Sequence, residues 1–418
     1  MDINSICDSL RKGTEKLALQ NATVKNAALV AVCESLRKNK ADIFAANEID
    51  VKIAREKGTR ESLIDRLSLD EKKMEGIIGG VESIIAQTDP IGEETAGWKT
   101  PNGLLIRQTR VPVGVVAIIY ESRPNVTVDA FALAYKSANA ILLRGSSSAL
   151  NSNKAIVKAI KEGLASVENG VPEAVELAPC ESRDEVPEIL TAVGKIDLAL
   201  PRGSANLIKT VVETAKVPVI ETGSGICHLY VDESADLDMA AKIAANGKMQ
   251  RPGVCNALEC IVINKNVAEN FVPKLADVFA GKVEVRADEK SYGLFEKAGY
   301  GKLIKAQDAD FGFEFLDMIC AVKVVDDIEE AIGYINTHNS KHSESIITNN
   351  MAHAKMFQAR IDASCVYVNA STRFTDGGEF GFGAELGIST QKMHARGPMG
   401  IKALTTIKYL IDGEDQIR

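Results

Sequence analysis

Apolar positions in the first fifth of the chain recur at intervals of three and four residues. Two such rows run through Val24, Ala28, Val32 and Leu36 and through Ile77, Ile78, Val81, Ile84 and Ile85. This spacing places apolar side chains on one face of a helix. The pattern predicts a run of helices over residues 2–88.

A change of composition follows this helical segment. Residues 88–103 are rich in glycine, proline and threonine, which marks a boundary. Residues 104–110 start apolar and turn polar, which favours an exposed strand although the alternation is poor. Near the other end, the apolar, β-branched residues 405–411 predict a closing strand. Because exposed strand edges invite pairing, we expect these two strands to mediate self-association.

Two runs of alternating strands and helices occupy the rest of the chain. In the first, we expect strands at 115–119, 140–143, 174–177, 198–200 and 217–220, with helices at 125–138 and 151–164. In the second, we expect strands at 229–231, 259–263, 320–325, 345–348 and 365–369, with helices at 237–249, 268–279, 328–335 and 351–359. This order predicts right-handed βαβ units on parallel sheets, which bind ligands beyond the carboxyl ends of their strands. Residues 373–400 are dense in glycine and form either a cleft-lining loop or a surface loop.

Composition narrows the possible functions. The chain has 418 residues, enough for two or three domains, and a net charge of −8 without a basic cluster, so we expect neither nucleic-acid nor membrane binding. The longest apolar run, residues 111–120, is too short to span a bilayer, and the N-terminus lacks the apolar stretch of a signal peptide. Eight scattered cysteines without a C-x-x-C pair indicate free thiols and a cytoplasmic location.

Cys255 and Glu221 are the residues that carry the clearest chemical signal. Cys255 ends the Gly-containing stretch Gln250-Arg251-Pro252-Gly253-Val254-Cys255, and Glu221 stands beside Gly223-Ser224-Gly225 after an apolar segment. A thiol on such a loop is a candidate nucleophile, and a nearby carboxylate is a candidate base. The pair suggests covalent catalysis at a carbonyl carbon through a thioester, although most free cysteines are simply buried apolar residues.

Glycine- and serine-containing stretches after the strands are candidate phosphate sites. Arg144-Gly145-Ser146-Ser147-Ser148 could offer backbone N–H groups and a guanidinium to an anion, or Ser could merely cap a helix. Pro201-Arg202-Gly203-Ser204-Ala205 could place a helix N-terminus against a pyrophosphate. The fingerprint G-x-G-x-x-G is absent. Gly223-Ser224-Gly225 is expected to be a tight turn. His338 and His342 are four apart, but residues 336–340 are predicted to be a loop, and we expect no metal site.

The order of these segments resembles the aldehyde dehydrogenase superfamily over essentially the whole chain. The matching stretches are Tyr120-Glu121-Ser122-Arg123-Pro124-Asn125-Val126, residues 142–147, residues 221–228, residues 250–256 and Gly387-Ile388-Ser389-Thr390-Gln391-Lys392-Met393-His394-Ala395-Arg396-Gly397-Pro398. The resemblance implies an α/β fold with a Rossmann-like cofactor domain, an α/β catalytic domain and a small oligomerisation β-flap. It implies an NADP(H)-binding domain at 1–94 and 114–222, a catalytic domain at 223–401 and oligomerisation strands at 95–113 and 402–418.

The resemblance also implies roles for individual residues. Cys255 matches the nucleophile, Asn125 the oxyanion-stabilising amide and Glu314 the residue that holds the nicotinamide ribose. Arg144, Ser146 and Ser147 stand where many relatives have Lys-Pro-Ser-Glu, which favours NADP(H) over NAD(H), and Gly203 and Ser204 would face the pyrophosphate. Glu221 matches the general base but could instead position Cys255 or shuttle protons. Arg123, Arg251, Lys392 and Arg396 are candidates for the substrate's anionic groups, or else surface salt-bridge or capping residues. His394 could neighbour the phosphate by motif position alone.

The branch of the superfamily that the chain resembles most reduces L-glutamyl 5-phosphate to L-glutamate 5-semialdehyde with NADPH, the second step of proline synthesis. The resemblance further implies a homo-oligomer and a possible functional coupling to glutamate 5-kinase. Two alternatives remain: another aldehyde dehydrogenase, CoA-acylating or hydrolytic, that uses the same thioester, and a catalytically silent NADP-binding subunit.

Overall fold

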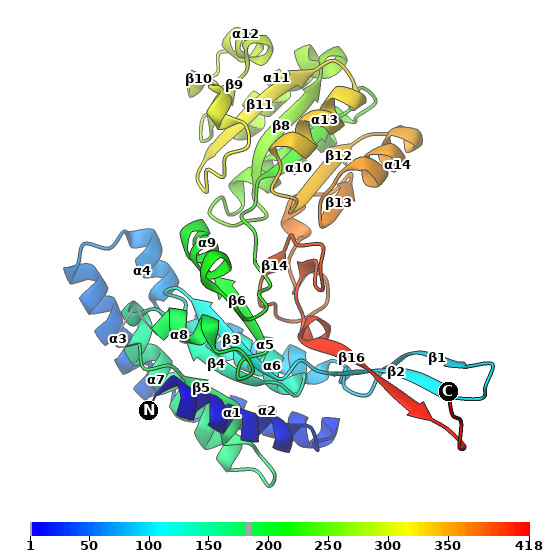
Figure 1. Cartoon of the computed structure of the whole chain (residues 1–418). Helices are drawn as coiled ribbons and strands as arrows, with labels where there is room; N and C mark the ends of the chain where they lie inside the picture. Colours follow the sequence, from blue (N-terminus) through cyan, green and yellow to red (C-terminus); the bar gives the residue numbers. More distant parts are fainter. Residues whose placement is uncertain (1, 181–184) are drawn as a thin grey trace. The chain divides into compact units, whose positions relative to one another are not determined.

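The computed structural model describes residues 2–180 and 185–418, and its chain divides into two compact units (Figure 1). The first unit contains the chain up to Thr222 together with Gly381–Gly387 and Met399–Arg418. The second unit contains Gly223–Phe380 and Ile388–Pro398. Each unit has its own parallel sheet.

The first unit begins with the predicted run of helices. They are α1 (Ile3–Leu17), α2 (Ala22–Lys38), α3 (Lys40–Glu56), α4 (Glu61–Leu67) and α5 (Glu71–Ala86). Asp2, Asn21 and Asp70 accept backbone hydrogen bonds at the starts of α1, α2 and α5, which satisfies N–H groups that a helix start leaves unpaired.

A four-stranded parallel sheet of order β5-β4-β3-β6 follows. Its elements are β3 (Val115–Tyr120), α6 (Pro124–Lys136), β4 (Ala140–Arg144), α7 (Leu150–Ala165), β5 (Val175–Leu177), α8 (Glu185–Thr191), β6 (Leu198–Arg202) and α9 (Ala205–Thr214). All six residues of β3 are buried, as expected of an unbroken apolar run inside a parallel sheet. The strand predicted at 217–220 is wrong: only an isolated bridge joins Val219 to Ala199. Pro218 has no N–H to donate, which limits pairing there.

A separate antiparallel sheet of order β1-β2-β16 belongs to the same unit. It contains β1 (Glu94–Lys99), β2 (Leu105–Pro112) and β16 (Thr405–Asp412), so the strands predicted at 104–110 and 405–411 are confirmed. Strand β1 was not predicted. Every one of its residues is exposed, and therefore its sequence carries none of the apolar alternation that identifies a half-buried strand.

The second unit is a seven-stranded, wholly parallel sheet of order β10-β9-β11-β8-β7-β12-β13. Its strands are β7 (Cys227–Val231), β8 (Leu258–Asn264), β9 (Glu284–Ala287), β10 (Leu303–Lys305), β11 (Ile319–Val325), β12 (Ser343–Ile347) and β13 (Cys365–Val368). Its helices are α10 (Leu237–Met249), α11 (Lys265–Phe279), α12 (Glu289–Lys297), α13 (Ile328–His338) and α14 (Met351–Arg360).

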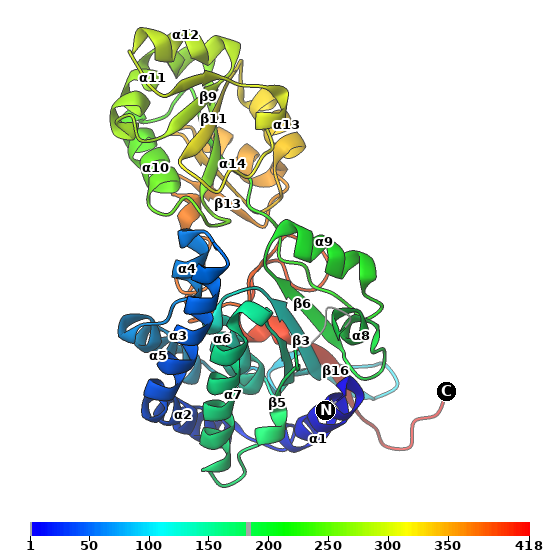
Figure 2. The ribbon, with the colours of Figure 1, turned by 90° about the vertical axis from the view of Figure 1, so that its left-hand side faces the viewer.

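Alternate residues of the central strands supply two cores on opposite faces of this sheet. Leu229 and Val231 pack with residues of α10, α11 and α12, whereas Tyr230 packs with residues of α13 and α14. These helices surround the sheet of the second unit (Figure 2). Successive side chains of a strand point to opposite faces, so one strand serves both cores. Strands β9 and β10 and helix α12 were not predicted.

The glycine-rich stretch 373–400 is not one continuous loop. A 3₁₀ turn at Thr372–Phe374 opens it, and β14 (Ile388–Ser389) pairs antiparallel with β15 (Gly397–Pro398). Residues 336–338, predicted to be loop, instead finish α13. Within residues 2–180 and 185–418, no helix is both long and apolar enough to cross a membrane.

Candidate active site

Cys255 lies in the second unit, in the segment that joins α10 to β8; residues 250–256 of this segment are called the Cys255 loop below. All eight cysteines are in the described part of the chain; Cys255 is partly exposed and the other seven are buried. A nucleophile must be reachable by its substrate, whereas a buried thiol is usually inert. Exposure therefore singles out the residue that its loop context predicted.

Gly225 packs directly against the backbone of Cys255. A β-carbon at position 225 would overlap the carbonyl group and the α-carbon of Cys255, so only glycine fits. Two residues later, the Cys227 thiol donates to the Cys255 carbonyl oxygen, with 3.3 Å between sulfur and oxygen. The tight turn predicted at Gly223-Ser224-Gly225 is wrong: the segment is irregular and runs alongside the Cys255 loop.

Glu314 is joined to this arrangement through Gly225. The Gly225 N–H donates to the Glu314 Oε1 at 2.6 Å, and burial raises the pKa of the Glu314 carboxyl group. The structure thus brings two of the predicted site residues, Cys255 and Glu314, into contact with one glycine. Neither sequence spacing nor motif indicated that contact.

A buried ion pair supports the loop that carries Glu314. The Lys248 Nζ lies 2.7 Å from the Glu259 Oε2, and both side chains are at most 1% exposed. The Glu259 Oε1 accepts a hydrogen bond from the N–H of Leu316, a residue with a φ of 54°. Burial raises the pKa of Glu259 to about 7, against the opposing effect of Lys248. This pair was not predicted from the sequence. The signal for it was a carboxylate inside the apolar strand 258–264, where a charged side chain needs a partner.

Two of the predicted substrate cations gather around Asp362. Its carboxylate lies 2.9 Å from the Lys392 Nζ, 2.8 Å from the Arg396 Nη2 and 3.3 Å from the Lys341 Nζ. Hydrogen bonds from Lys392 and Arg396 hold the pKa of Asp362 far below its usual range. Both cations are therefore ion-paired, the alternative that the sequence analysis left open. His394 is exposed between them, with a φ of 61°.

Histidine does not form a metal site in the described residues, which contain no group of three or more candidate ligands. His338 ends α13, where its Nδ1 lies 2.8 Å from the Tyr334 carbonyl oxygen. His342 is buried, with its Nδ1 3.8 Å from the Cys227 sulfur. The two histidines thus serve different local contacts.

In the first unit, Asn125 is the second residue of α6, directly after Pro124, and is partly exposed. Its side-chain N–H donates to the Asp129 Oδ2 at 3.1 Å, one helical turn later. Burial raises the pKa of Asp129 to about 6. This hydrogen bond orients the amide that the family resemblance marks as an oxyanion donor. Arg123 precedes the helix and Glu221 follows the bridge at Val219; both are partly exposed.

The candidate phosphate residues lie at the carboxyl ends of β4 and β6. The Arg144 Nη1 donates to the Gly145 carbonyl oxygen at 2.8 Å, and the Nε lies 3.8 Å from Glu185. Ser146 caps the short 3₁₀ turn Ser147–Ala149, and Ser147 is exposed. Ser204 caps α9 and donates to the Glu121 Oε1 at 2.6 Å. A β-carbon at Gly203 would meet Glu121, so the glycine leaves room beside an exposed helix N-terminus.

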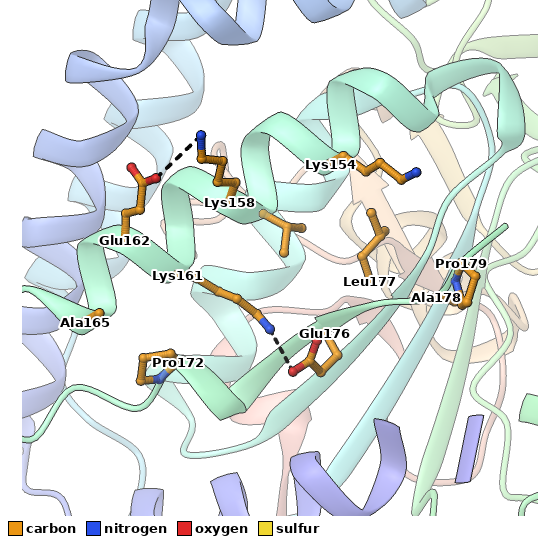
Figure 3. A pocket seen from close by; sticks show the side chains of 11 residues that line it. Lys154, Lys158, Lys161, Glu162, Ala165, Pro172, Glu176, Leu177, Ala178 and Pro179 are labelled. Atoms are coloured by element: carbon orange, nitrogen blue, oxygen red, sulfur yellow. Dashed lines mark ion pairs between the residues drawn. The ribbon is translucent and has the colours of Figure 1, made fainter. Parts of the chain in front are cut away.

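A pocket in the first unit lies between α7 and the edge strand β5 and has a volume of about 570 Å³ (Figure 3). Its lining includes Lys154, Lys158 and Lys161 of α7. Two of them are ion-paired, Lys158 with Glu162 and Lys161 with Glu176. None of the predicted site residues lines it.

Residues 1–310 and 316–409 match the model of the aldehyde dehydrogenase family. A gamma-glutamyl phosphate reductase from Alkaliphilus oremlandii is 51% identical over 99% of this chain and 98% of its own length. The crystal structure of a gamma-glutamyl phosphate reductase from Thermotoga maritima has a TM-score of 0.96 and 45% identity, with both chains fully covered. An acetylating aldehyde dehydrogenase from Geobacillus thermoglucosidasius, at 15% identity and a TM-score of 0.72, covers 99% of this chain and 97% of its own and shares the fold.

Proposed function

The chain belongs to the aldehyde dehydrogenase family, and from this premise we propose that it reduces L-glutamyl 5-phosphate to L-glutamate 5-semialdehyde and phosphate, with NADPH as reductant. Relatives about half identical over nearly their whole length are named gamma-glutamyl phosphate reductase, which supports this substrate. The observation that carries the proposal is the single partly exposed cysteine, Cys255, on a loop that packs against Gly225. The step would be the second of proline biosynthesis.

Cys255 acts as the nucleophile in this proposal. Its thiolate forms a bond to the acyl carbon while the bond from that carbon to the phosphate oxygen breaks, which leaves a thioester and free phosphate. The Asn125 amide and the Cys255 N–H donate to the oxyanion that develops; loss of one such donor typically costs about 3–4 kcal/mol of barrier. Glu221 positions Cys255 or relays a proton, since a base that activated water would destroy the thioester.

The first unit offers residues that fit a dinucleotide. Ser146 and Ser147 provide hydroxyl groups at the end of β4, and Gly203 and Ser204 open α9 where backbone N–H groups favour a pyrophosphate. Ser147 stands where the resemblance implies that many members of the superfamily carry a glutamate. With a serine there, the 2′-phosphate of NADPH is not repelled, and the Arg144 guanidinium offers it a positive charge. Glu314 would hold the nicotinamide ribose. When bound, NADPH supplies the hydride that reduces the acyl group.

The same proposal assigns roles to the segments. Residues 1–94 and 114–222 bind NADP(H), residues 223–401 carry the catalysis, and strands at 95–113 and 402–418 join subunits of a homo-oligomer. Ile407, Tyr409 and Ile411 support the last assignment: they alternate along the outer strand β16 and are 44%, 53% and 58% exposed. Such alternation puts three apolar side chains on one face of the sheet. We further propose a cytoplasmic location and functional coupling to glutamate 5-kinase.

The test of the activity is NADPH oxidation with enzymatically generated L-glutamyl 5-phosphate, compared with other acyl phosphates. In the reverse direction, oxidation of L-glutamate 5-semialdehyde should require inorganic phosphate, and CoA should not replace it. Cys255→Ser should bind NADPH and lose reduction, whereas Cys260→Ser, a buried strand residue, should keep it. Phosphate-independent oxidation, or full activity of Cys255→Ser, would refute the proposal.

A further inference from the structure

Arg373, which the sequence analysis did not single out, is tied to both ends of the Cys255 loop. Its Nε donates to the Oε1 of Gln250, the first residue of that loop, at 3.1 Å. At the other end, the side-chain N–H groups of Asn256 donate to the carbonyl oxygens of Arg373 at 3.3 Å and of Thr375 at 2.8 Å. The Thr372 hydroxyl returns a hydrogen bond to the Asn256 carbonyl oxygen at 2.9 Å. These contacts fix Arg373 beside the nucleophile.

The charges around Arg373 are not balanced by a paired carboxylate. Burial is the main cause that lowers the Arg373 pKa, and repulsion from Arg251 adds to it; Asp376, Cys255 and Cys227 act in the opposite direction. Among the described residues, no carboxylate lies within ion-pair distance of either arginine. Asp376 is turned to the N–H groups of Gly378 and Glu379 instead. Repulsion between like charges disfavours the charged form of Arg373, and an anion bound beside the two arginines would offset it.

The reaction itself places an anion at this position. In an acyl phosphate, one oxygen joins the phosphorus atom to the carbon that the thiolate attacks, so the phosphate must lie against the Cys255 loop. As the sulfur–carbon bond forms and the carbon–oxygen bond breaks, that phosphate takes the electron pair and gains charge. Guanidinium groups suit phosphate because they donate two parallel hydrogen bonds.

We propose that Arg373, with Arg251, forms the binding site for the phosphate group of the acyl phosphate, in the forward direction as leaving group and in the reverse direction as inorganic phosphate. This inference rests on the proposed function. It also separates three of the four predicted substrate cations: Arg251 stands at the phosphate site, whereas Lys392 and Arg396 are already paired with Asp362.

Kinetics of the reverse reaction test the site with inorganic phosphate as the probe. Arg373→Gln should raise the KM for phosphate at least tenfold and leave the KM for the semialdehyde within about twofold. The burst of p-nitrophenol from p-nitrophenyl acetate, which reports acylation of Cys255 by a donor without phosphate, should be unchanged. Arg360→Gln is the matched control: this arginine of α14 pairs with Glu329, and its loss should leave all three values unchanged.

Arg373→Lys keeps the positive charge but cannot donate two parallel hydrogen bonds. Its KM for phosphate should lie between those of the wild type and Arg373→Gln. If Arg373→Gln fails to fold, as judged by its thermal transition, the Arg373→Lys comparison decides the matter. If the wild-type enzyme depends on phosphate but Arg373→Gln leaves the KM for phosphate unchanged, this inference is wrong and the proposed function stands. The same holds if only the KM for the semialdehyde rises. A wild-type enzyme that ignores phosphate overturns the proposed function as well.

Discussion

Gly225→Ala is the most direct perturbation of the Cys255 loop, because it adds a single methyl group at its closest contact. That β-carbon would overlap the carbonyl group and the α-carbon of Cys255, both of which are backbone and cannot rotate away. Two backbone segments must therefore separate. The Gly225 N–H that donates to Glu314 and the Cys255 carbonyl oxygen that accepts from Cys227 would move with them.

The size of the effect follows from these contacts. Overpacking a dense interior typically costs about 1–3 kcal/mol, which corresponds to a fall in Tm of about 2–4 °C for each kcal/mol in a unit of this size. Activity should suffer more than stability, since a displacement of about 1 Å at a catalytic group can cost about a hundredfold in rate. We expect the rate of Cys255 alkylation and the turnover to fall together.

Gly333→Ala is the matched control within the same unit. Gly333 lies inside α13, and a β-carbon there would meet nothing within 4 Å. Replacing a helical glycine by alanine stabilises the folded protein by about 0.5–1 kcal/mol, so this variant should have a slightly higher Tm and keep full activity. A Gly225→Ala protein with wild-type turnover and wild-type Tm would show that the contact with Cys255 does not constrain the loop.

Three further changes test the surroundings of the site. Lys248→Met should cost about 3–5 kcal/mol at pH 8.5 because it leaves Glu259 charged and buried. The pKa of Glu259 in the folded protein, about 7, lies above its unfolded value, so stability falls as pH rises from about 4.5. Because the variant lacks the opposing effect of Lys248, its stability should continue to fall above pH 7. The loss in free energy of unfolding relative to the wild type should therefore be smaller at pH 5.5 than at pH 8.5. Equal losses at both pH values, measured by urea unfolding, would contradict this. Asp362→Asn should cost about 1 kcal/mol at pH 7, since its ion pairs are partly exposed. Because the pKa of Asp362 is lowered by folding, its contribution is present above the unfolded pKa near 3.8 and is lost as pH falls below it; a variant and wild type that differ equally at pH 7 and pH 2 would argue against the ion pairs. Ile411→Lys on β16 should reduce the mass measured by light scattering, whereas Ile304→Lys on β10, where the side chain is 46% exposed, should not; identical masses in all three proteins would refute the assignment of β16 to the subunit interface.

Local patterns predicted the elements whose composition follows from burial. The periodic apolar positions of α2 and α5 and the unbroken apolar run of β3 identified these elements, because the side chains that pack into a core are apolar. Strand β1 is fully exposed, and its pairing with β2 rests on backbone hydrogen bonds that leave no trace in side-chain type. Residues 217–220 show the opposite error, since apolar composition predicted a strand where Pro218 restricts pairing.

Candidate residues were found where a motif is continuous in sequence and missed where a site depends on distant contacts. Cys255 could be named from its own loop. The requirement for Gly225 could not, because the atom that excludes a side chain there belongs to a residue thirty positions away. Lys248 and Glu259, and likewise Asp362 and Lys392, are joined only by the fold. A charged residue in an apolar stretch indicates that an ion-pair partner is needed, but the topology of the fold decides which residue that partner is.

The arginines and lysines of the second unit illustrate how that decision bears on chemistry. Lys392 and Arg396 occupy the stretch most specific to the resemblance, yet each already has an ion pair with Asp362, at 2.9 Å and 2.8 Å. An anionic ligand would have to compete with Asp362 for them. Arg373 stands outside every matched stretch, but its guanidinium group has no carboxylate partner in the described residues, and its backbone is fixed by Asn256, the neighbour of the nucleophile. Since attraction between unit charges at about 4 Å is worth several kcal/mol near a protein surface, the cation without an ion-pair partner is the better ligand for phosphate. The ion pairs that a cation already makes, rather than its place in a motif, thus separate cations that hold the fold from those that can bind substrate.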